Sequence, residues 1–255
     1  MSTPPVTRKH EEIAESLTRD ILVGQYRIGE RLPSERDLAA RFDANRGAVR
    51  EAMKKLEQLG LASIHQGGAR VAAVQTASLD VVGHLLALGE LPDEDLVDEI
   101  MQVLTALITL AAESTVRRAS DAQIAAIRER VKPLLAPAGD RSAHALARFE
   151  LVGAIMEASG NLVCQMIAHR LVVQFAPRMA PLEDYVEFDP GVHREFARRL
   201  DAALASRNVD AVRDAFETLS NFNRDVARRA FAAIRARGSA NPGNLGTPGP
   251  QGQAK

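Results

Sequence analysis

The sequence predicts a mainly α-helical protein, with a small N-terminal domain of three helices and a β-hairpin, followed by an antiparallel all-α bundle of about seven helices. Only 4% of the 255 residues are aromatic and none is Trp, a composition that favours helix packing over a β-sandwich. Apolar residues recur at helical spacing over most of the chain. A hydrophobic content of 46% is enough to bury a core in each of two modest domains.

Three helices are expected in the N-terminal domain. The first covers residues 8–24, where apolar residues repeat at helical spacing. Ser34 is a good N-cap for a short second helix through Phe42. Asn45 caps a third helix that ends at Gly60, since glycine readily adopts the left-handed conformation found after a helix. The second and third helices are almost contiguous, so the pair is a helix-turn-helix by length and by pattern.

A β-hairpin is expected directly after the third helix. Residues 61–64 and 70–74 are short β-like runs, and they flank a segment that contains Gly67 and Gly68. The tip of such a hairpin needs glycine for a positive φ. This wing completes a winged helix-turn-helix domain over residues 8–75.

The remainder of the chain is expected to be helical up to its last residues. Residues 79–237 show one helical pattern after another, separated by short segments rich in Gly, Pro, Asn or Asp. The tail, residues 238–255, holds five Gly and three Pro with almost no large apolar side chain. Because it cannot offset the entropy lost on ordering, we expect this tail to be disordered.

A positively charged face on the third helix predicts binding to double-stranded DNA. Arg46, Arg50 and Lys54 follow one another at a spacing of one helical turn, on the side opposite Val49 and Met53. Although the formal net charge of the chain is −1, residues 36–70 hold seven Lys or Arg against four Asp or Glu. The positive field is therefore local. Arginine reads guanine well in the major groove, because its fork matches the O6 and N7 acceptors.

Other residues near this face are also candidates for contact with DNA. Arg36, at the start of the second helix, could reach the same groove from beside it. Gly47 lacks a side chain, so the backbone near the helix N-terminus could approach a phosphate closely. Lys54, Lys55 and Arg41 are expected either to contact the DNA backbone or to be simply solvated.

These segments resemble a known family. Residues 32–39, 45–52 and 56–61, together with the glycine pair, are similar to the winged helix-turn-helix of the GntR family of bacterial transcription regulators. The helical second part, with Phe149 followed by Ala158-Ser159-Gly160-Asn161, resembles the ligand-binding FCD domain of the FadR subfamily. The resemblance covers residues from about 8 to 235. It implies a homodimer that binds a pseudo-palindromic operator as a repressor or activator and responds to a small-molecule effector.

The resemblance also implies which residues contact DNA. In the subfamily, DNA contacts come from three arginines and from the tip of the wing, which fall at Arg36, Arg46, Arg50, Gln66 and Gly67. The family often has Ser or Thr where this chain has Asn45 and Ala48. A hydroxyl contact to phosphate is therefore lost at Ala48, and the preferred operator sequence would differ in detail.

The metal site of the resembled family is expected to be lost, and no cofactor is expected. Many members hold a divalent metal with one Asp and three His, the first two in an Asp-x-x-Phe-His arrangement. In this sequence Leu146 and Glu150 stand at the positions of these two ligands, and the later histidines would fall near Ala197 and Leu219. His193 could be a ligand shifted by one turn, but a surface or capping histidine is the preferred interpretation.

The effector pocket is expected to be apolar. An Arg that many members use to grip an acidic effector is replaced by Leu104, which leaves few anchors for a small carboxylate. Such an interior suits an apolar or amphipathic ligand, or no ligand at all. The pattern is most similar to the branch that senses acyl-CoA, although the matching contact positions do not keep its grip. The candidate effector-binding residues are Leu104, Glu150, Asn161, His193, Ser220 and Asn223.

Two other classes of function compete with this interpretation. An enzyme could use the acid/base candidates Glu150, Asp184, Glu187 and His193, but no nucleophile motif, phosphate loop or metal set accompanies them. Catalysis is therefore not expected. In the second alternative the protein binds DNA without an effector, and its helical domain only dimerises.

The expected setting is the reducing cytoplasm. Cys164 is the only cysteine, which excludes an intrachain disulfide. The first residues lack the pattern of a signal peptide, and no stretch approaches the roughly 18 apolar residues of a membrane helix. No membrane partner is therefore expected.

Overall fold

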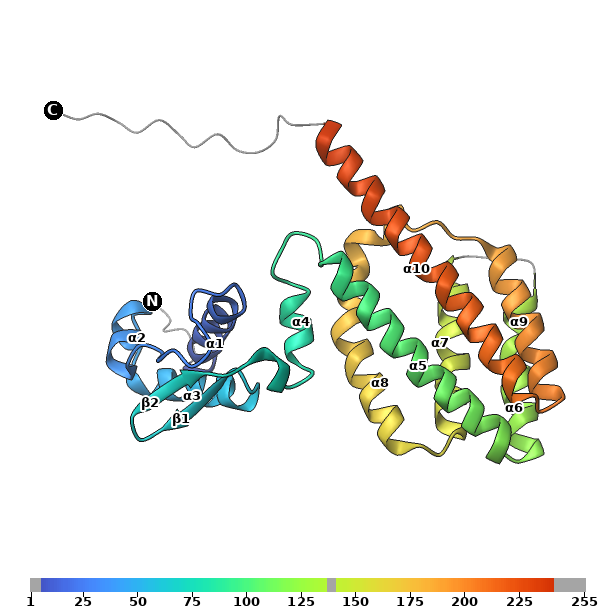
Figure 1. The fold of residues 1–255 in the computed structure, drawn as a ribbon, viewed down its shortest axis with the longest axis horizontal. Helices are drawn as coiled ribbons and strands as arrows, with labels where there is room; N and C mark the ends of the chain where they lie inside the picture. The colour runs from blue at the N-terminus through green and yellow to red at the C-terminus, as the bar shows by residue number, and fades with distance from the viewer. Residues whose placement is uncertain (1–5, 137–140, 241–255) are drawn as a thin grey trace. The chain divides into compact units, whose positions relative to one another are not determined.

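In the computed structural model, the described residues are 6–136 and 141–240. They form ten α-helices, two 3-10 helices and one two-stranded antiparallel sheet (Figure 1). The chain divides into two compact units, the first made of Met1–Ile100 and Gln165–Met179 and the second of Met101–Cys164 and Ala180–Lys255. The predicted mainly helical fold with a small wing is confirmed, while the domain limits at 8–75 and 79–237 stay predictions.

Three helices build the core of the first unit. They are α1 (Val6–Leu22), α2 (Glu35–Arg41) and α3 (Arg46–Gln58). The apolar stripe of α1 packs along α3, and α2 packs on the same helix. The fully buried side chains at their centre are Ile13, Leu17, Leu38, Val49 and Leu56. The spacing is four residues between Ile13 and Leu17 on α1 and seven between Val49 and Leu56 on α3, as expected for one face of a helix.

The predicted caps of α2 and α3 are confirmed. The Ser34 hydroxyl accepts a hydrogen bond from the Asp37 backbone N–H at 3.3 Å, and the Asn45 side-chain oxygen accepts one from the Ala48 N–H at 2.8 Å. Each bond satisfies a backbone donor that the first turn of a helix leaves without a partner. Between the helices, Asp43 adopts a φ of +45°, which makes the short turn possible.

The wing is a tight hairpin. Strands β1 (Ala62–His65) and β2 (Gly68–Val71) pair antiparallel and leave only Gln66 and Gly67 at the tip. The second strand therefore begins two residues earlier than predicted. Gly68 has a φ of +106°, and a Cβ there would lie 2.8 Å from the Arg31 Nε. Of the glycine pair, Gly68 is thus the position that requires glycine.

The first unit also contains segments from elsewhere in the chain. These are the 3-10 turn η1 (Val74–Thr76), helix α4 (Val81–Leu85) and most of helix α8 (Leu162–Phe175). An ion pair between Arg170 and Asp80 joins α8 to the residue before α4. This contact joins residues ninety positions apart, and it helps explain why part of α8 groups with the N-terminal helices.

The second unit is a helical bundle. Its elements are α6 (Asp121–Leu135), α7 (Arg141–Ala158), α9 (Pro190–Ala205) and α10 (Val209–Ala240), together with α5 (Glu94–Arg118) and η2 (Ala176–Tyr185), which both begin in the first unit. Helix α6 packs against both α7 and α9, and α9 packs against α10 (Figure 1). With α4 and α8 these make seven α-helices after residue 79, as predicted.

Polar contacts tie the bundle helices together. The Arg128 guanidinium on α6 meets the Asp201 carboxylate on α9 at 2.7 Å and 3.0 Å. The Thr115 hydroxyl on α5 donates a hydrogen bond to the Ile155 carbonyl on α7 at 2.9 Å. Helix α5 is therefore fixed against α7 by a buried bond.

The end of the chain differs from the prediction at its first residues. Helix α10 continues to Ala240, so residues 238–240 of the predicted disordered tail are helical. The rest of that tail, residues 241–255, lies outside the described residues. Within the described parts of the chain, no helix has both the length and the apolarity needed to cross a lipid bilayer.

Candidate DNA-binding face and effector cavity

The exposed side of α3 carries the arginines predicted to read DNA. Arg46 is the first residue of the helix and Arg50 lies one turn later, and both are exposed. Val49 and Met53, on the opposite side, are buried in the domain core. The core therefore holds the helix from one side and leaves the arginine side open to solvent.

Arg50 has a partner that the sequence did not reveal. Its Nε lies 3.0 Å and 2.9 Å from the two carboxylate oxygens of Glu35, the first residue of α2. The Arg50 side chain remains 64% exposed, and an ion pair of this kind contributes little to stability. The ion pair instead orients Arg50, because Glu35 holds its guanidinium at the surface. A DNA group that bound Arg50 would have to compete with this carboxylate.

Arg36 and Lys54 are similarly open. The Arg36 side chain is 80% exposed and lies 3.5 Å from the Asp37 carboxylate. The pKa of Asp37 is lowered, first by its hydrogen bond with Ser34 and then by the charge of Arg36. Lys54 pairs with Glu51 one turn earlier, at 2.9 Å. These weak surface pairs can be exchanged for phosphate contacts.

Arg41 has a structural role that was not expected, although its side chain is 42% exposed. Its guanidinium meets the buried Asp20 carboxylate at 2.7 Å and the Tyr26 hydroxyl at 3.2 Å. The hydrogen bond with Asp20 raises the pKa of Arg41. Arg41 therefore joins α2 to α1.

Glycine at position 47 also has a structural explanation that does not involve DNA. A Cβ at this position would lie 3.2 Å from the Asn45 side-chain oxygen that caps α3.

The eight predicted DNA-binding residues are all exposed, and they are Arg36, Asn45, Arg46, Gly47, Arg50, Lys54, Gln66 and Gly67. Their contact with DNA stays a prediction.

A cavity lies inside the bundle of the second unit, between α5, α7, α9 and α10. Its volume is about 340 Å³, at the lower end of the range of small-molecule sites. Most of its wall is apolar, from Ile108, Leu151, Val152, Phe196, Phe216 and Leu219. The polar residues of the wall are Thr105, Arg148, Ser220 and Asn223.

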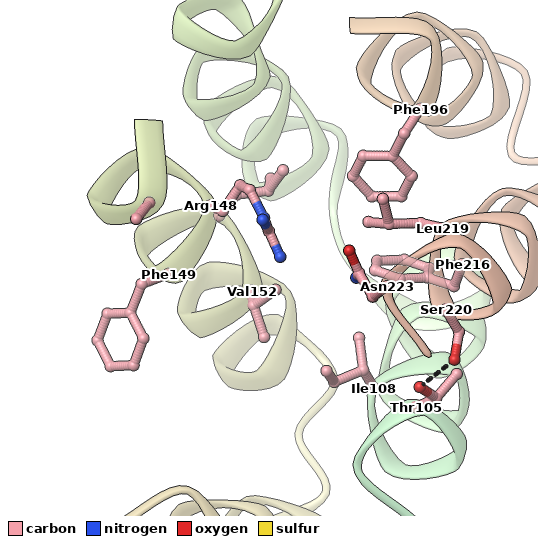
Figure 2. A pocket seen from close by; sticks show the side chains of 12 residues that line it. Thr105, Ile108, Arg148, Phe149, Val152, Phe196, Phe216, Leu219, Ser220 and Asn223 are labelled. Carbon is pink, nitrogen blue, oxygen red and sulfur yellow. Dashed lines mark hydrogen bonds between the residues drawn. The ribbon is translucent and has the colours of Figure 1, made fainter. Parts of the chain in front are cut away.

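Arg148 brings a charge into this apolar space. Figure 2 shows its guanidinium turned toward the space it shares with Asn223, whereas Phe149 points away. Thr105 and Ser220 form a hydroxyl pair at 2.7 Å in another part of the wall. The cavity thus has a cationic region and a neutral polar region, with apolar side chains between them.

His193 holds the Arg148 guanidinium. Its Nδ1 lies 2.8 Å from the Asp189 backbone carbonyl, and its Nε2 lies 2.9 Å from the Arg148 Nη1. A carbonyl oxygen can only accept, so Nδ1 carries the proton and Nε2 accepts from the arginine. Burial, followed by the charge of Arg148, lowers the pKa of His193 to about 4. The imidazole is therefore neutral at pH 7.

A second buried histidine packs beside the first. The ring centroids of His144 and His193 are 5.0 Å apart, and His144 also meets the edge of Phe188. Neither ring nitrogen of His144 has a hydrogen-bond partner among the described residues. Burial lowers the pKa of His144. His193 is only 3% exposed, so it is not a surface histidine, although its ring bonds the backbone carbonyl of Asp189, the N-cap residue of α9.

The cavity includes some of the predicted effector residues and not others. Ser220 and Asn223 line it, and His193 contacts Arg148. Leu104 is partly buried but does not line the cavity, and Glu150 is exposed. The Asn161 side chain instead accepts a hydrogen bond from the Cys164 N–H at the start of α8.

The described residues do not fit a divalent metal. They contain no group of three His, Cys, Asp or Glu side chains that could hold one. Leu146 and Glu150, the positions compared with metal ligands, are both exposed on α7. Neither lines the cavity, whereas Arg148 and Val152 on the same helix do. A guanidinium bonded to His193 occupies that side and would repel a cation.

The expectation that the bundle offers few anchors for a carboxylate did not include Arg148, which lines the cavity. The sequence contained a signal for it. His144, Arg148, Leu151 and Ile155 recur at a spacing of three or four residues, so they share one face of α7. The other three are buried, and a lone arginine on a core-facing stripe indicates a charge turned inward.

Comparison with known proteins agrees with both parts of the fold. Residues 9–71 match the family described as bacterial regulatory proteins, gntR family, and residues 99–221 match the FCD domain. A solved structure of Lar, described as controlling the Listeria monocytogenes agr system, has a TM-score of 0.51 at 14% identity. The match covers 91% of this chain and 99% of that chain, which supports the fold alone.

Two curated relatives are transcription regulators. HTH-type transcriptional regulator Mce2R of Mycobacterium tuberculosis is 28% identical over 188 residues, which cover 71% of this chain and 77% of Mce2R. HTH-type transcriptional repressor NanR of Escherichia coli is 37% identical over 89 residues, 34% of this chain and 33% of NanR. The family and these relatives are DNA-binding regulators rather than enzymes, as the sequence predicted. The chain therefore belongs to the GntR family of bacterial transcription regulators and carries an FCD domain behind its winged helix-turn-helix.

Proposed function

We propose that this regulator binds a pseudo-palindromic operator as a homodimer and that a small metabolite in the helical bundle changes its affinity for that operator. The observation that carries the DNA part is the exposed face of α3, where Arg46 and Arg50 stand opposite a buried core. In a helix-turn-helix, the first turns of the second helix point at base edges in the major groove. These two arginines are placed to meet guanine there.

The remaining contacts of each head are to the DNA backbone or the adjacent groove. Arg36 approaches from α2, Lys54 contacts phosphate farther along α3, and the wing tip at Gln66 and Gly67 lies against the duplex. Two heads on two half-sites add their phosphate contacts, which makes the affinity fall steeply with salt concentration. Dimerisation is therefore part of the mechanism.

The cavity near Arg148 supports the effector part of the proposal. Its size and its mostly apolar wall with a few polar groups are typical of a small-molecule site. A ligand there can act on DNA binding only if it binds one dimer geometry better than another. The resemblance to the FadR subfamily makes a fatty acyl-CoA or another apolar ligand the first candidate to test.

Selection of genomic fragments by the purified protein, followed by sequencing, tests the DNA part. We expect a recurrent palindromic sequence among the selected fragments, and loss of selection for the variant carrying both Arg46→Ala and Arg50→Ala. The matched control carries Arg130→Ala and Lys132→Ala, two exposed cations on α6. Equal selection by both double variants would contradict the proposed reading face.

Titration of the protein and its operator with long-chain acyl-CoA tests the first candidate effector. No heat in calorimetry, together with unchanged operator affinity, would exclude acyl-CoA. If no small molecule changes operator affinity, the alternative holds, in which the helical domain only dimerises. The cavity favours an effector over this alternative.

A further inference from the structure

Arg148 is a partly buried cation that has no acidic partner among the residues that the structure describes. Among the described residues its hydrogen bond is to the neutral imidazole of His193, and no carboxylate forms an ion pair with it. Burial lowers the pKa of its guanidinium, yet arginine stays charged in proteins. The cavity therefore contains a positive charge that no described side chain neutralises.

The partners of Arg148 keep this charge available. His193 is fixed as a neutral acceptor because its Nδ1 proton is engaged by the Asp189 carbonyl. A guanidinium has five N–H donors in a planar fork, and only one nitrogen, Nη1, is engaged by His193. Donors on the rest of the fork remain for a ligand, and Figure 2 shows the group turned into the cavity. An uncompensated charge beside apolar walls is costly unless a counter-ion binds it.

We propose that Arg148 anchors a metal-independent site for a small amphipathic carboxylate, whose anionic head pairs with the guanidinium while its apolar body fills the cavity. This inference rests on the proposed role of the cavity as the effector site. The head meets the free side of the Arg148 fork, and the Asn223 amide lies in the same part of the wall. Arg148 thus supplies the positive charge that a metal ion would otherwise bring to a carboxylate.

The rest of the wall limits the ligand's size and charge. Phe196, Phe216 and Leu219 line the space beside the guanidinium and suit an aliphatic or aromatic body. Among the described lining residues Arg148 alone is charged, so the cavity matches one negative charge rather than a polyanion. A cavity of about 340 Å³ suits a free short acid. An acyl-CoA would instead leave its phosphates without cations in this cavity.

Calorimetric titration of the full-length protein with octanoate, in buffer containing EDTA, tests the proposal. We expect saturable binding of one octanoate per chain, and binding of octanamide weaker by about 30-fold or more, because the neutral amide lacks the charge that pairs with Arg148. Arg148→Met should weaken octanoate to a similar extent. Arg141→Met, at the exposed start of α7, should leave its affinity unchanged.

A matched pair of substitutions at His193 separates charge from folding. His193→Gln keeps a neutral oxygen that can accept from Arg148 and should retain octanoate binding within a few-fold. His193→Glu places a carboxylate beside the guanidinium and neutralises the charge of Arg148. This variant should lose saturable octanoate binding although Arg148 itself is unchanged. Circular dichroism and the affinity for duplex DNA confirm that both variants are folded.

Three results would overturn the proposal: equal affinity for octanoate and octanamide, unchanged binding by Arg148→Met, or binding that appears only after a divalent metal is added. Absence of octanoate binding to the unmodified protein would overturn it as well. The broader regulatory function is measured separately, by operator affinity with and without octanoate. Binding at Arg148 without any change in operator affinity would leave the carboxylate site standing and contradict its role as an effector site.

Discussion

The DNA-binding domain and the helical bundle each contain an arginine that we propose binds a negatively charged ligand, but the two arginines are held differently. Arg50 lies in solvent and is paired with the Glu35 carboxylate. Arg148 lies against apolar walls and is held by the neutral His193. In water an acidic partner costs little and is easily replaced by DNA. Inside a cavity an acidic partner would cancel the charge, so a neutral acceptor keeps the arginine oriented and still cationic.

The difference suggests how to recognise a ligand-binding arginine. A surface arginine with an acidic residue beside it is common. It indicates a binding site only when the helix that carries it and the neighbouring residues also fit a ligand. A partly buried arginine without an acid is rare, because its desolvation is not repaid within the protein. The two regions therefore predict different consequences when charge, shape or pH is changed.

The largest expected effect is on operator affinity, when Arg46 and Arg50 keep their positive charge but lose the shape of the guanidinium group. Arg46→Lys combined with Arg50→Lys keeps both charges but removes the fork that matches guanine. We expect operator affinity to fall on the order of a thousandfold or more in a dimer, at about 1–3 kcal/mol for each lost bidentate contact. Affinity for unrelated duplex should change little. Fluorescence anisotropy with both duplexes measures the two constants, and an equal loss on both would contradict base reading.

The next effect concerns pH and the bundle. The pKa of His193 is lowered to about 4 in the folded protein. Between pH 6.5 and 4, His193 is therefore protonated to a greater extent in the unfolded chain than in the folded protein. The contribution of His193 to the free energy of unfolding is therefore complete above pH 6.5 and falls, on the order of 2 kcal/mol, as pH drops to 4. Urea denaturation at several pH values measures this loss.

His193→Gln isolates this contribution from the other titrating groups. The neighbouring His144 also has a lowered pKa, which changes stability in the same direction. The difference between the unmodified protein and His193→Gln should therefore narrow as pH falls from 6.5 toward 4. A difference that is constant over this range would show that His193 does not titrate as the geometry indicates.

Local sequence signals predicted much of the head. Ser34 and Asn45 predicted the starts of α2 and α3, and the two glycines predicted the hairpin. These signals are local, because caps and tight turns depend on residues only a few positions apart. The breaks between the bundle helices were predictable for the same reason. The two caps and the hairpin were confirmed within a few residues.

The contacts that orient the charged groups were not predictable in this way. Glu35 and Arg50 are fifteen residues apart and meet only because α2 packs on α3. Arg148 and His193 are forty-five residues apart and come from different bundle helices. No local pattern encodes either pair. The inward direction of Arg148 was readable from its place on a core-facing stripe, but its neutral partner required the fold.

A moderate effect is expected when the acidic partner of Arg50 is removed. Glu35→Gln should change the free energy of unfolding by only about 0–1 kcal/mol, because the pair is exposed. Removal of a negative charge from the DNA-binding face should raise the affinity for unrelated duplex severalfold at low salt. Glu129→Gln, which breaks an exposed pair with Lys132 on α6, is the control for both measurements. A stability loss above about 2 kcal/mol would mean that the Glu35 pair holds the two helices together rather than orienting Arg50.

The smallest effect distinguishes a phosphate contact from a base contact within α3. Lys54 is exposed and, among the described residues, pairs with Glu51 in its own helix, so Lys54→Ala should leave the fold intact. If Lys54 meets phosphate, its removal weakens operator and unrelated duplex alike and lowers the slope of log affinity against log salt by about 1 per contact. Lys132→Ala on α6 should leave that slope unchanged. An effect confined to the operator would instead place Lys54 among the residues that read bases, and the reading surface would then extend two turns beyond Arg46 along α3.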